Sequence, residues 1–379
     1  MRNIIYLDNG STTMVDPKVA DKIMIYMTEK YGNASSLHQK GQETKMALEE
    51  SRLVIAKSIN SKPSEIVFTS GGSEANNLAI KGVAYMHKKG HIITSAIEHP
   101  SVLETVKGLK DQGFDFSIIK VDKDGFIDIE QLKNEIRNDT ILVSIMHANN
   151  EIGTIQDIEL IGKICKDKKI LSHTDAVQSY SKIPIDVKKI NVDLVSLNAH
   201  KLHGPKGIGV LFIKEGTKIK RLIDGGNQEI KLRAGTENIP GIVGFAEAVK
   251  SISNSDIKRM EKLRDKLIDG ILKIKDTRLN GPREKRLCNN VNISFKFVEG
   301  EAIGGYLDAE GICSSTGSAC SSKSLEPSHV LMALGLKEED AHGSLRLTLG
   351  KFTTEKEIDF VLQKLPGIIE KLRRMSPFK

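Results

Sequence analysis

The stretch IVFTSGGSEANNLAIKGVA (residues 66–84) decides the fold class. It starts with apolar and β-branched residues, passes through a Gly-rich turn, and continues with apolar residues at helical spacing. The same order, a short β-type run and then a longer helical stretch, recurs along the chain as far as residue 213. This alternation predicts an α/β fold with a mostly parallel sheet that is covered by helices on both faces.

The strands and helices of this part are predicted from apolar runs and helical periodicity. Strands are expected at 66–69, 91–94, 116–121, 141–146, 170–174, 192–197 and 208–213. Helices are expected at 17–29, 42–59, 73–89, 101–111, 128–137 and 157–168. The first helix has Asp16 as its N-cap and Pro17 at its first position. The last two strands lie too close together for a helical crossover, so we expect one of them to be antiparallel.

The pattern changes after Pro240. Further helices are expected at about 240–253, 256–275, 300–309 and 354–374, with strands at 290–295 and 345–349. We therefore expect a large domain, residues 14–253, that contains a seven-stranded sheet. A small α+β domain would be formed by residues 1–13 and 254–379.

Composition excludes several classes of protein. With 39% hydrophobic and 28% charged residues the chain is neither fibrous nor largely disordered. Its apolar runs are far shorter than the roughly 20 residues of a membrane span, and the first residues lack the apolar core of a signal peptide, so we expect a cytoplasmic protein without membrane contact.

The excess of 56 basic over 49 acidic residues is spread along the chain and aromatics make up only 4%. We interpret these charges as solvated helix faces and expect no direct nucleic-acid binding; an acidic protein partner or an anionic cofactor stays open.

The cysteines argue against structural disulfides and metals. The chain has 4 cysteines, scattered and without a CxxC pair. His200 and His203 lie close in sequence, but no acidic or thiol ligand stands at helical spacing beside them. We therefore expect no metal site made by this chain alone.

Polar residues follow five of the predicted strands, just beyond their carboxyl ends. They are Ser70–Ser73, Glu98 and His99, His147 and Asn149–Glu151, Asp175 and Gln178, and Asn198, His200 and Lys201. In parallel α/β sheets ligands bind at this edge, so the sequence predicts a site there.

The residue types indicate pyridoxal phosphate. The Ser70–Ser73 turn opens a helix, and its backbone N–H groups and positive dipole end suit a phosphate. A carboxylate at one strand end, Asp175, and a lysine at another, Lys201, match the two groups that this cofactor requires: an acid for the pyridine nitrogen and an amine for the aldehyde. An ordinary ion pair that caps two strands is the alternative interpretation.

Seven motifs carry a family resemblance. They are YLDNGSTT, FTSGGSEANNLAIKG, HANNEIGTIQDI, DAVQS, AHKLHGPKGIGVLF, RAGTEN and TGSACSSKSLEPSHVLMALG. In this order, from residue 6 to about residue 365, they resemble the NifS/IscS-type cysteine desulfurases. These are pyridoxal-phosphate enzymes of the class V aminotransferase group, and the resemblance implies their type I aminotransferase-like fold.

The resemblance implies a role for each matching residue. Lys201 would bind the cofactor covalently and move the Cα proton, Asp175 would pair with the pyridine nitrogen, and Gln178 with the ring hydroxyl. His99 would stack on the ring and assist proton transfer. The residues implied around the phosphate are Gly72, Ser73 and His200, with Asn198 nearby. Asn198 departs from the family, which usually has serine or threonine there, so its role is open.

The resemblance also implies how substrate and subunits come together. Asn33, Asn150 and Arg346 would hold the carboxylate of L-cysteine, since a guanidinium binds a carboxylate with two parallel hydrogen bonds. Asn150 would also adjoin the cofactor. Thr236 would reach the phosphate in the other subunit of a homodimer.

Cys320 is implied as the nucleophile. It stands in Ser314–Ser324, a stretch of small polar residues that we interpret as a mobile loop. It would take sulfur from L-cysteine as a persulfide, leave L-alanine, and pass the sulfur to an acceptor such as an iron–sulfur scaffold protein, a tRNA-thiolation relay or a nitrogenase-assembly protein. A transient iron–sulfur cluster on Cys320 stays open. Lys323 is interpreted as a solvated side chain, the alternative being that it lowers the pKa of the nearby thiol.

Other functions use the same residues differently. An aminotransferase or a selenocysteine lyase would keep Lys201, Asp175 and His99, but an aminotransferase would not need Cys320. A catalytically silent binding protein, for instance an RNA-binding accessory in tRNA thiolation, would show no cofactor band.

Overall fold

A seven-stranded sheet forms the centre of the larger part of the molecule. The structure is a computed structural model that describes residues 4–316 and 326–377. In spatial order the strands are β2 (Ile66–Thr69), β8 (Gly209–Ile213), β7 (Leu194–Asn198), β6 (Leu171–Asp175), β5 (Thr140–Ser144), β3 (Gly90–Ser95) and β4 (Phe114–Ile119). Only β8 runs antiparallel, to both β2 and β7. All other strands therefore present their carboxyl ends at one edge, and both the mostly parallel sheet and the antiparallel strand are confirmed.

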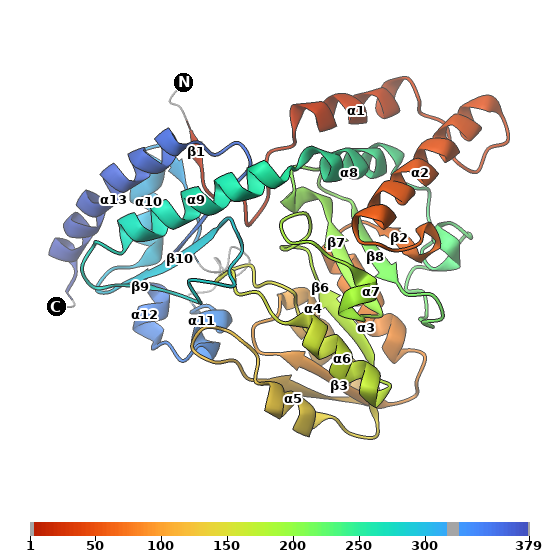
Figure 1. Cartoon of the computed structure of the whole chain (residues 1–379), viewed down its shortest axis with the longest axis horizontal. Coiled ribbons are helices and arrows are strands. Elements are labelled where there is room, and N and C mark those ends of the chain that lie inside the picture. The colour runs from red at the N-terminus through yellow and green to blue at the C-terminus, as the bar shows by residue number, and fades with distance from the viewer. Residues whose placement is uncertain (1–3, 317–325, 378–379) are drawn as a thin grey trace.

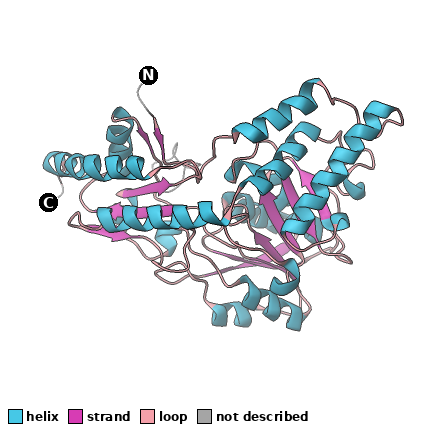
Figure 2. Ribbon diagram, turned by 45° about the horizontal axis from the view of Figure 1, so that its top comes forward, coloured by secondary structure: helices cyan, strands magenta, loops and turns pink. Residues whose placement is uncertain are grey.

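Helices cover both faces of this sheet, as Figures 1 and 2 show. They are α1 (Pro17–Thr28), α2 (Gln39–Ser58), α3 (Gly72–Ala84), α4 (Pro100–Leu109), α5 (Ile129–Glu135), α6 (Ile158–Lys168), α7 (Val187–Ile190) and α8 (Ile239–Ser251). Residues of α1, α2, α6 and α8 share one apolar cluster with Phe68 of β2, whereas α3 and α4 share another with its neighbour Val67. Successive strand residues thus point to opposite faces, and each face finds an apolar helix surface.

The long helix α9 (Asn254–Ile271) leads into a second unit. Its elements are β9 (Thr277–Leu279), β10 (Asn290–Phe295), α10 (Gly300–Ala309), β11 (Ile312–Cys313), α11 (His329–Ala333), α12 (Glu338–His342), β12 (Ser344–Thr348) and α13 (Glu355–Met375). Strand β10 lies antiparallel between β9 and β12. Strand β1 (Ile5–Tyr6) pairs parallel with β11, so Ile5 and Tyr6 lie in this unit, and Figure 1 shows β1 beside one end of α13. Ile5 and Leu7 accordingly share an apolar cluster with α9, α10 and α13.

The differences from the predicted elements have local causes. β4 starts two residues earlier than predicted and β5 ends at Ser144 instead of 146. The predicted helix 73–89 ends at Ala84, because a turn over residues 85–89 leads into β3, which begins at Gly90. β1, β9, β11, α7, α11 and α12 were not predicted, because elements of two to five residues are too short to show a period. Among the described residues, no helix is both long and apolar enough to span a bilayer.

A buried ion pair fixes α2 to the edge of the sheet. Arg52 Nη1 and Nη2 each lie 2.9 Å from a carboxylate oxygen of Glu229, and Nη1 also donates to the carbonyl of Ile66 at 2.7 Å. Glu229 accepts a further hydrogen bond from the backbone N–H of Phe68. Both charged residues are 5% exposed. Removing one partner would leave the other charge buried and unpaired.

We therefore predict that Arg52→Met lowers the free energy of unfolding by about 3–5 kcal/mol, because the Glu229 carboxylate loses its counter-ion inside the protein. Urea denaturation followed by circular dichroism measures the change. Lys62→Met is the matched control, since Lys62 pairs with Glu215 while both side chains are more than 60% exposed; its effect should stay below about 1 kcal/mol. Equal effects of the two substitutions would contradict the prediction.

Candidate active site

A cavity of about 300 Å³ opens at the carboxyl edge of the sheet, where segments following β2, β3, β5, β6 and β7 converge. The second unit closes it with Arg346 of β12 and His329 of α11. The lining residues are Gly10, Ser11, Gly72, Ser73, Asn76, His99, Pro100, Ser101, Met146, Asn150, Glu151, Asp175, Val177, Gln178, Asn198, His200, Lys201, His329 and Arg346. The volume suits a small ligand, and most of the lining residues have polar or charged side chains.

One end of the cavity is the N-terminus of α3. Gly72 is the first helical residue, and Gly72 and Ser73 both line the cavity. A Cβ at Gly72 would lie 2.8 Å from Val177 Cγ2, so a larger residue would displace a wall of the site. The His200 ring lies 3.2 Å, by Nδ1, from Thr12 Oγ1, and burial together with Lys201 lowers the pKa of His200 to about 3. A neutral imidazole and free helix N–H groups make this end suitable for a phosphate.

Asp175 ends β6 at the centre of the edge, and its carboxylate is held on both oxygens. Oδ1 accepts the backbone N–H of Val177 at 2.9 Å. Oδ2 accepts Nδ2 of Asn76 at 2.7 Å. These two hydrogen bonds fix the orientation of the Asp175 carboxylate, which lines the cavity.

Lys201 reaches the same cavity from the short helix that follows β7. Its Nζ donates to the carbonyl oxygens of Gly10 and Ser11, both at 2.6 Å. The Gly10 carbonyl also accepts Nε2 of Gln178 at 2.9 Å. The N-terminal segment Asp8–Thr12 therefore holds the amine of Lys201 and the amide of Gln178 side by side.

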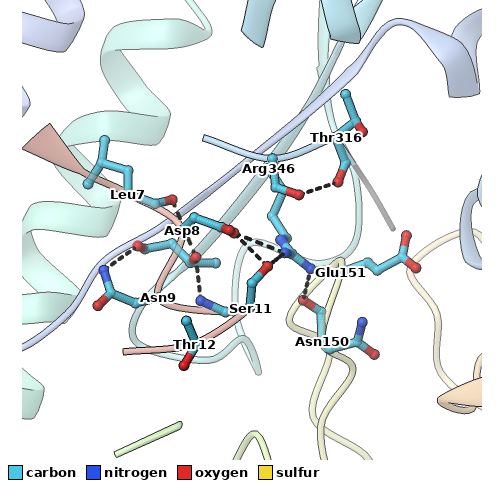
Figure 3. Close-up of polar contacts among 12 residues, drawn as sticks. Leu7, Asp8, Asn9, Ser11, Thr12, Asn150, Glu151, Thr316 and Arg346 are labelled. Carbon is cyan, nitrogen blue, oxygen red and sulfur yellow. Dashed lines mark hydrogen bonds and ion pairs between the residues drawn. The ribbon is translucent and has the colours of Figure 1, made fainter. Parts of the chain in front are cut away.

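Arg346 lines the cavity from β12, and Figure 3 shows its polar contacts with the N-terminal segment and with Asn150. Its Nη2 donates to Asp8 Oδ1 at 3.1 Å and to Ser11 Oγ at 2.7 Å, and Nη1 donates to the Asn150 carbonyl at 3.2 Å. The residue is 2% exposed. A buried guanidinium with fixed neighbours can bind a carboxylate in one defined orientation.

Two buried acids support the loops around the cavity. Burial raises the pKa of Glu98 to about 8, while its Oε1 accepts Ser95 Oγ and the Met146 N–H. Burial also raises the pKa of Glu151, whose Oε2 accepts Ser328 Oγ at 2.5 Å. Ser328 caps α11, so Glu151 ties the second unit to the sheet edge.

The structure brings most of the residues singled out in the sequence into this one cavity. Gly72, Ser73, His99, Asn150, Asp175, Gln178, Asn198, His200, Lys201 and Arg346 all line it. Asn33 and Thr236 do not: both are exposed and lie outside the cavity of their own chain. Cys320 lies outside the described residues.

The sequence analysis did not single out Asn76, Ser101 and His329, although a sequence feature links each of them to the predicted site. Asn76 stands four residues after Gly72, on the same face of the helix. Ser101 follows His99 by two residues at a helix start, where a side chain caps the backbone. His329 belongs to a quoted motif without having been given a role. Among the described residues, no group of three or more metal-ligating side chains occurs.

Comparison with known proteins agrees with this geometry. A family model described as aminotransferase class-V matches residues 5–361. The chain belongs to this family. Over 385 aligned residues it is 51% identical to cysteine desulfurase IscS of Dictyoglomus turgidum, which covers 100% of this chain and 98% of that relative. It is also 51% identical to cysteine desulfurase IscS of Methanosarcina thermophila, with 98% and 94% covered. The NifS/IscS-type resemblance and the pyridoxal-phosphate dependence inferred from the sequence are confirmed.

Solved structures of similar proteins also match this chain over nearly its whole length. A NifS-like protein superposes with a TM-score of 0.91 at 41% identity, covering 97% of this chain and all of that one. A protein described as SspA in complex with cysteine superposes with a TM-score of 0.84 at 36% identity, covering 92% and 100%. The expected type I aminotransferase-like fold is therefore confirmed.

The raised pKa of Glu98 leads to a prediction about stability and pH. In the folded protein the Glu98 carboxyl group keeps its proton up to about pH 8, whereas in the unfolded chain it loses the proton near its ordinary pKa of 4.5. The wild type therefore loses stability as the pH rises between these values, and Glu98→Gln does not. The stability of the variant relative to wild type should rise by up to about 1.4 kcal/mol per pH unit.

Unfolding of both proteins at pH 5.5 and pH 7.5 measures this difference. Glu104→Gln is the control, because Glu104 is an exposed carboxylate on α4 that pairs with Lys107. A stability difference between wild type and Glu98→Gln that does not change with pH would show that Glu98 is charged in the folded protein.

Proposed function

We propose that this chain converts L-cysteine to L-alanine with pyridoxal phosphate and takes the sulfur as a persulfide on Cys320. The observation that carries the proposal is the convergence of Lys201, Asp175 and Arg346 in one cavity of about 300 Å³. A lysine, a fixed carboxylate and a buried guanidinium are the groups that an amino-acid enzyme with this cofactor requires. The full-length similarity to cysteine desulfurases directs the proposal to cysteine.

The residues present fit the cofactor. Gly72, Ser73 and His200, which all line the cavity, would hold its phosphate, because they offer helix N–H groups, a hydroxyl and a ring. Asp175 would face the pyridine nitrogen, and Gln178 the ring hydroxyl. When bound, the cofactor supplies an electron sink for negative charge at the substrate Cα. Lys201 would hold it covalently.

The remaining residues bind and act on the substrate. Arg346 would hold the carboxylate of L-cysteine, with Asn150 beside it, while Asp8 and Ser11 keep the guanidinium in place. Lys201 Nζ would take the Cα proton. The thiolate of Cys320 would then attack the substrate sulfur, so that an S–S bond forms as the C–S bond breaks and the carbon keeps the electron pair and gains a proton. The products are L-alanine and the persulfide.

A homodimer is part of this proposal. A second cavity, of about 590 Å³, is lined by Ala34 and Ser35, which follow Asn33, and by Glu237, which follows Thr236. Asn33 and Thr236, which do not line the active cavity of their own chain, are thus next in sequence to residues of this second cavity. Their exposure supports a function for Thr236, and for Asn33 with it, at the site of a partner subunit.

The path of the sulfur beyond Cys320 is proposed from the relatives. An iron–sulfur scaffold protein is the acceptor that the relatives' name, IscS, favours. A cytoplasmic location and the division into domains 14–253 and 1–13 with 254–379 remain part of the proposal. The separate apolar cluster that joins Ile5 and Leu7 to α9, α10 and α13 supports this division.

We predict that Lys201→Ala abolishes the covalent link to the cofactor and lowers alanine formation from L-cysteine by at least about a hundredfold, since the proton-transfer group at Cα is lost. Borohydride reduction followed by mass spectrometry checks the link, and an alanine assay checks the activity. Lys206→Ala removes an exposed lysine of the same loop and should leave both unchanged. Normal alanine formation by Lys201→Ala would contradict the assignment.

We predict that Cys320→Ser keeps the visible band of the bound cofactor but forms no alanine above background, because a hydroxyl cannot accept the sulfur. Wild-type protein given L-cysteine without reductant should gain the mass of one sulfur on the peptide that contains Cys320. Cys313→Ser, which changes a thiol at the end of β11, is the control and should remain active. Added sulfur on Cys165, Cys288 or Cys313 would show that another thiol is the nucleophile.

A further inference from the structure

A chain of hydrogen bonds connects Asp175 to His99 through Asn76 and Ser101, two side chains that have no role in the proposed reaction. Nδ2 of Asn76 donates to Asp175 Oδ2 at 2.7 Å and to Ser101 Oγ at 2.8 Å. Ser101 Oγ in turn lies 2.8 Å from His99 Nδ1. Asn76 is 1% exposed, so both contacts are inside the protein.

The direction of each hydrogen bond follows from its partners. A carboxylate only accepts, so Asn76 presents its NH₂ group to Asp175 and its second hydrogen to Ser101. Ser101 Oγ, having accepted from Asn76, gives its hydrogen to His99 Nδ1. The backbone N–H of Ser101 points to the same nitrogen at 3.1 Å. A hydrogen on Nδ1 would face this N–H, so Nδ1 is an acceptor and the ring carries its hydrogen on Nε2.

We propose that Asn76 and Ser101 are positioning residues that keep His99 as a neutral imidazole with its hydrogen on Nε2, so that His99 serves as a fixed hydrogen-bond donor and not as a proton carrier. The proposal rests on the proposed function, because His99 lines the cavity that would hold the cofactor. A second protonation would have to occur on Nδ1, which already faces two donors of Ser101.

The charges around His99 agree with a neutral ring. Burial lowers its pKa, Lys201 and His329 lower it further, and Asp175 alone opposes them. Lys201 follows β7, His329 starts α11 and Asp175 ends β6, so charged or titratable groups approach the ring from three elements. Because the neutral His99 ring needs no counter-ion, the Asp175 carboxylate, which Asn76 and Val177 hold in place, would pair with the cofactor ring nitrogen instead.

The tautomer can be measured directly in the full-length protein with cofactor bound. ¹⁵N-histidine NMR, with His99→Gln used for assignment, should show Nδ1 unprotonated and Nε2–H between about pH 6 and 8. Ser101→Ala removes one of the two donors to Nδ1 and should shift the His99 signals part of the way toward the other tautomer or the charged ring, because the backbone N–H of residue 101 remains. Asn76→Ala should do the same, since the Ser101 hydroxyl is then free to turn.

Kinetics give a second readout. Ser101→Ala should lower kcat for L-cysteine about three- to tenfold, the equivalent of one hydrogen bond, with KM unchanged. Ser101→Thr retains a hydroxyl and should restore kcat. The matched controls are Thr105→Val, which removes a hydroxyl one turn further along α4, and Asn77→Ala, which removes the neighbouring amide on α3; both should behave as wild type.

A His99 ring that carries a hydrogen on Nδ1 or is charged at pH 7 in the wild type would overturn the proposal. So would a Ser101→Ala variant with the NMR signals and kcat of Thr105→Val. Failure of the wild type to form alanine from cysteine would contradict the proposed function instead, and the NMR result would still decide the tautomer.

Discussion

The carbonyl groups of Gly10 and Ser11 are the contacts on which the rest of the site depends. They accept the amine of Lys201, and the Gly10 carbonyl also accepts the amide of Gln178. The same segment binds the second unit, since Asp8 and Ser11 Oγ hold Arg346. Residues that come from two separate apolar cores are thus placed against one short piece of backbone. Neither core alone could set the distance between the lysine and the guanidinium.

The sequence predicted the large sheet and most of the cavity because both depend on strong local patterns. Lys201, Asp175 and His99 each follow a strand, and parallel strands bring such positions to one edge. Arg346 was placed by resemblance alone, because a single arginine in a strand carries no sign of its partners. The contacts of Asn76 and Ser101 join different elements, and Thr236 and Asn33 lie outside the cavity of one chain. Such contacts depend on tertiary or quaternary structure, which periodicity does not encode.

Hydrogen bonding and burial decide which groups in and around the site are charged and which are neutral. Asp175 and Arg346 have several hydrogen-bonding neighbours each, which offset the cost of burying a charge. Glu98 and His200 are pushed toward their uncharged forms, by burial in both and by Lys201 beside His200. Asp175 and Arg346 therefore offer charges of opposite sign to a ligand in the cavity, whereas His200 lines the cavity as a neutral ring.

The pairing of the N-terminus with the last strands has a consequence for biosynthesis. β1 pairs with β11, the Leu7 carbonyl accepts the Thr348 N–H at 2.6 Å, and Gly10 N–H donates to Thr348 Oγ1. Residues 5–10 are therefore synthesised more than 300 residues before Ile312, Cys313 and Thr348, with which they pair. During translation Asp8–Thr12 has no strand to lie against, and the acceptors of Lys201 are not yet in place. A nascent chain that ends before β12 lacks both Thr348 and Arg346, which hold this segment, so the acceptors of Lys201 are placed only after β12 has been made.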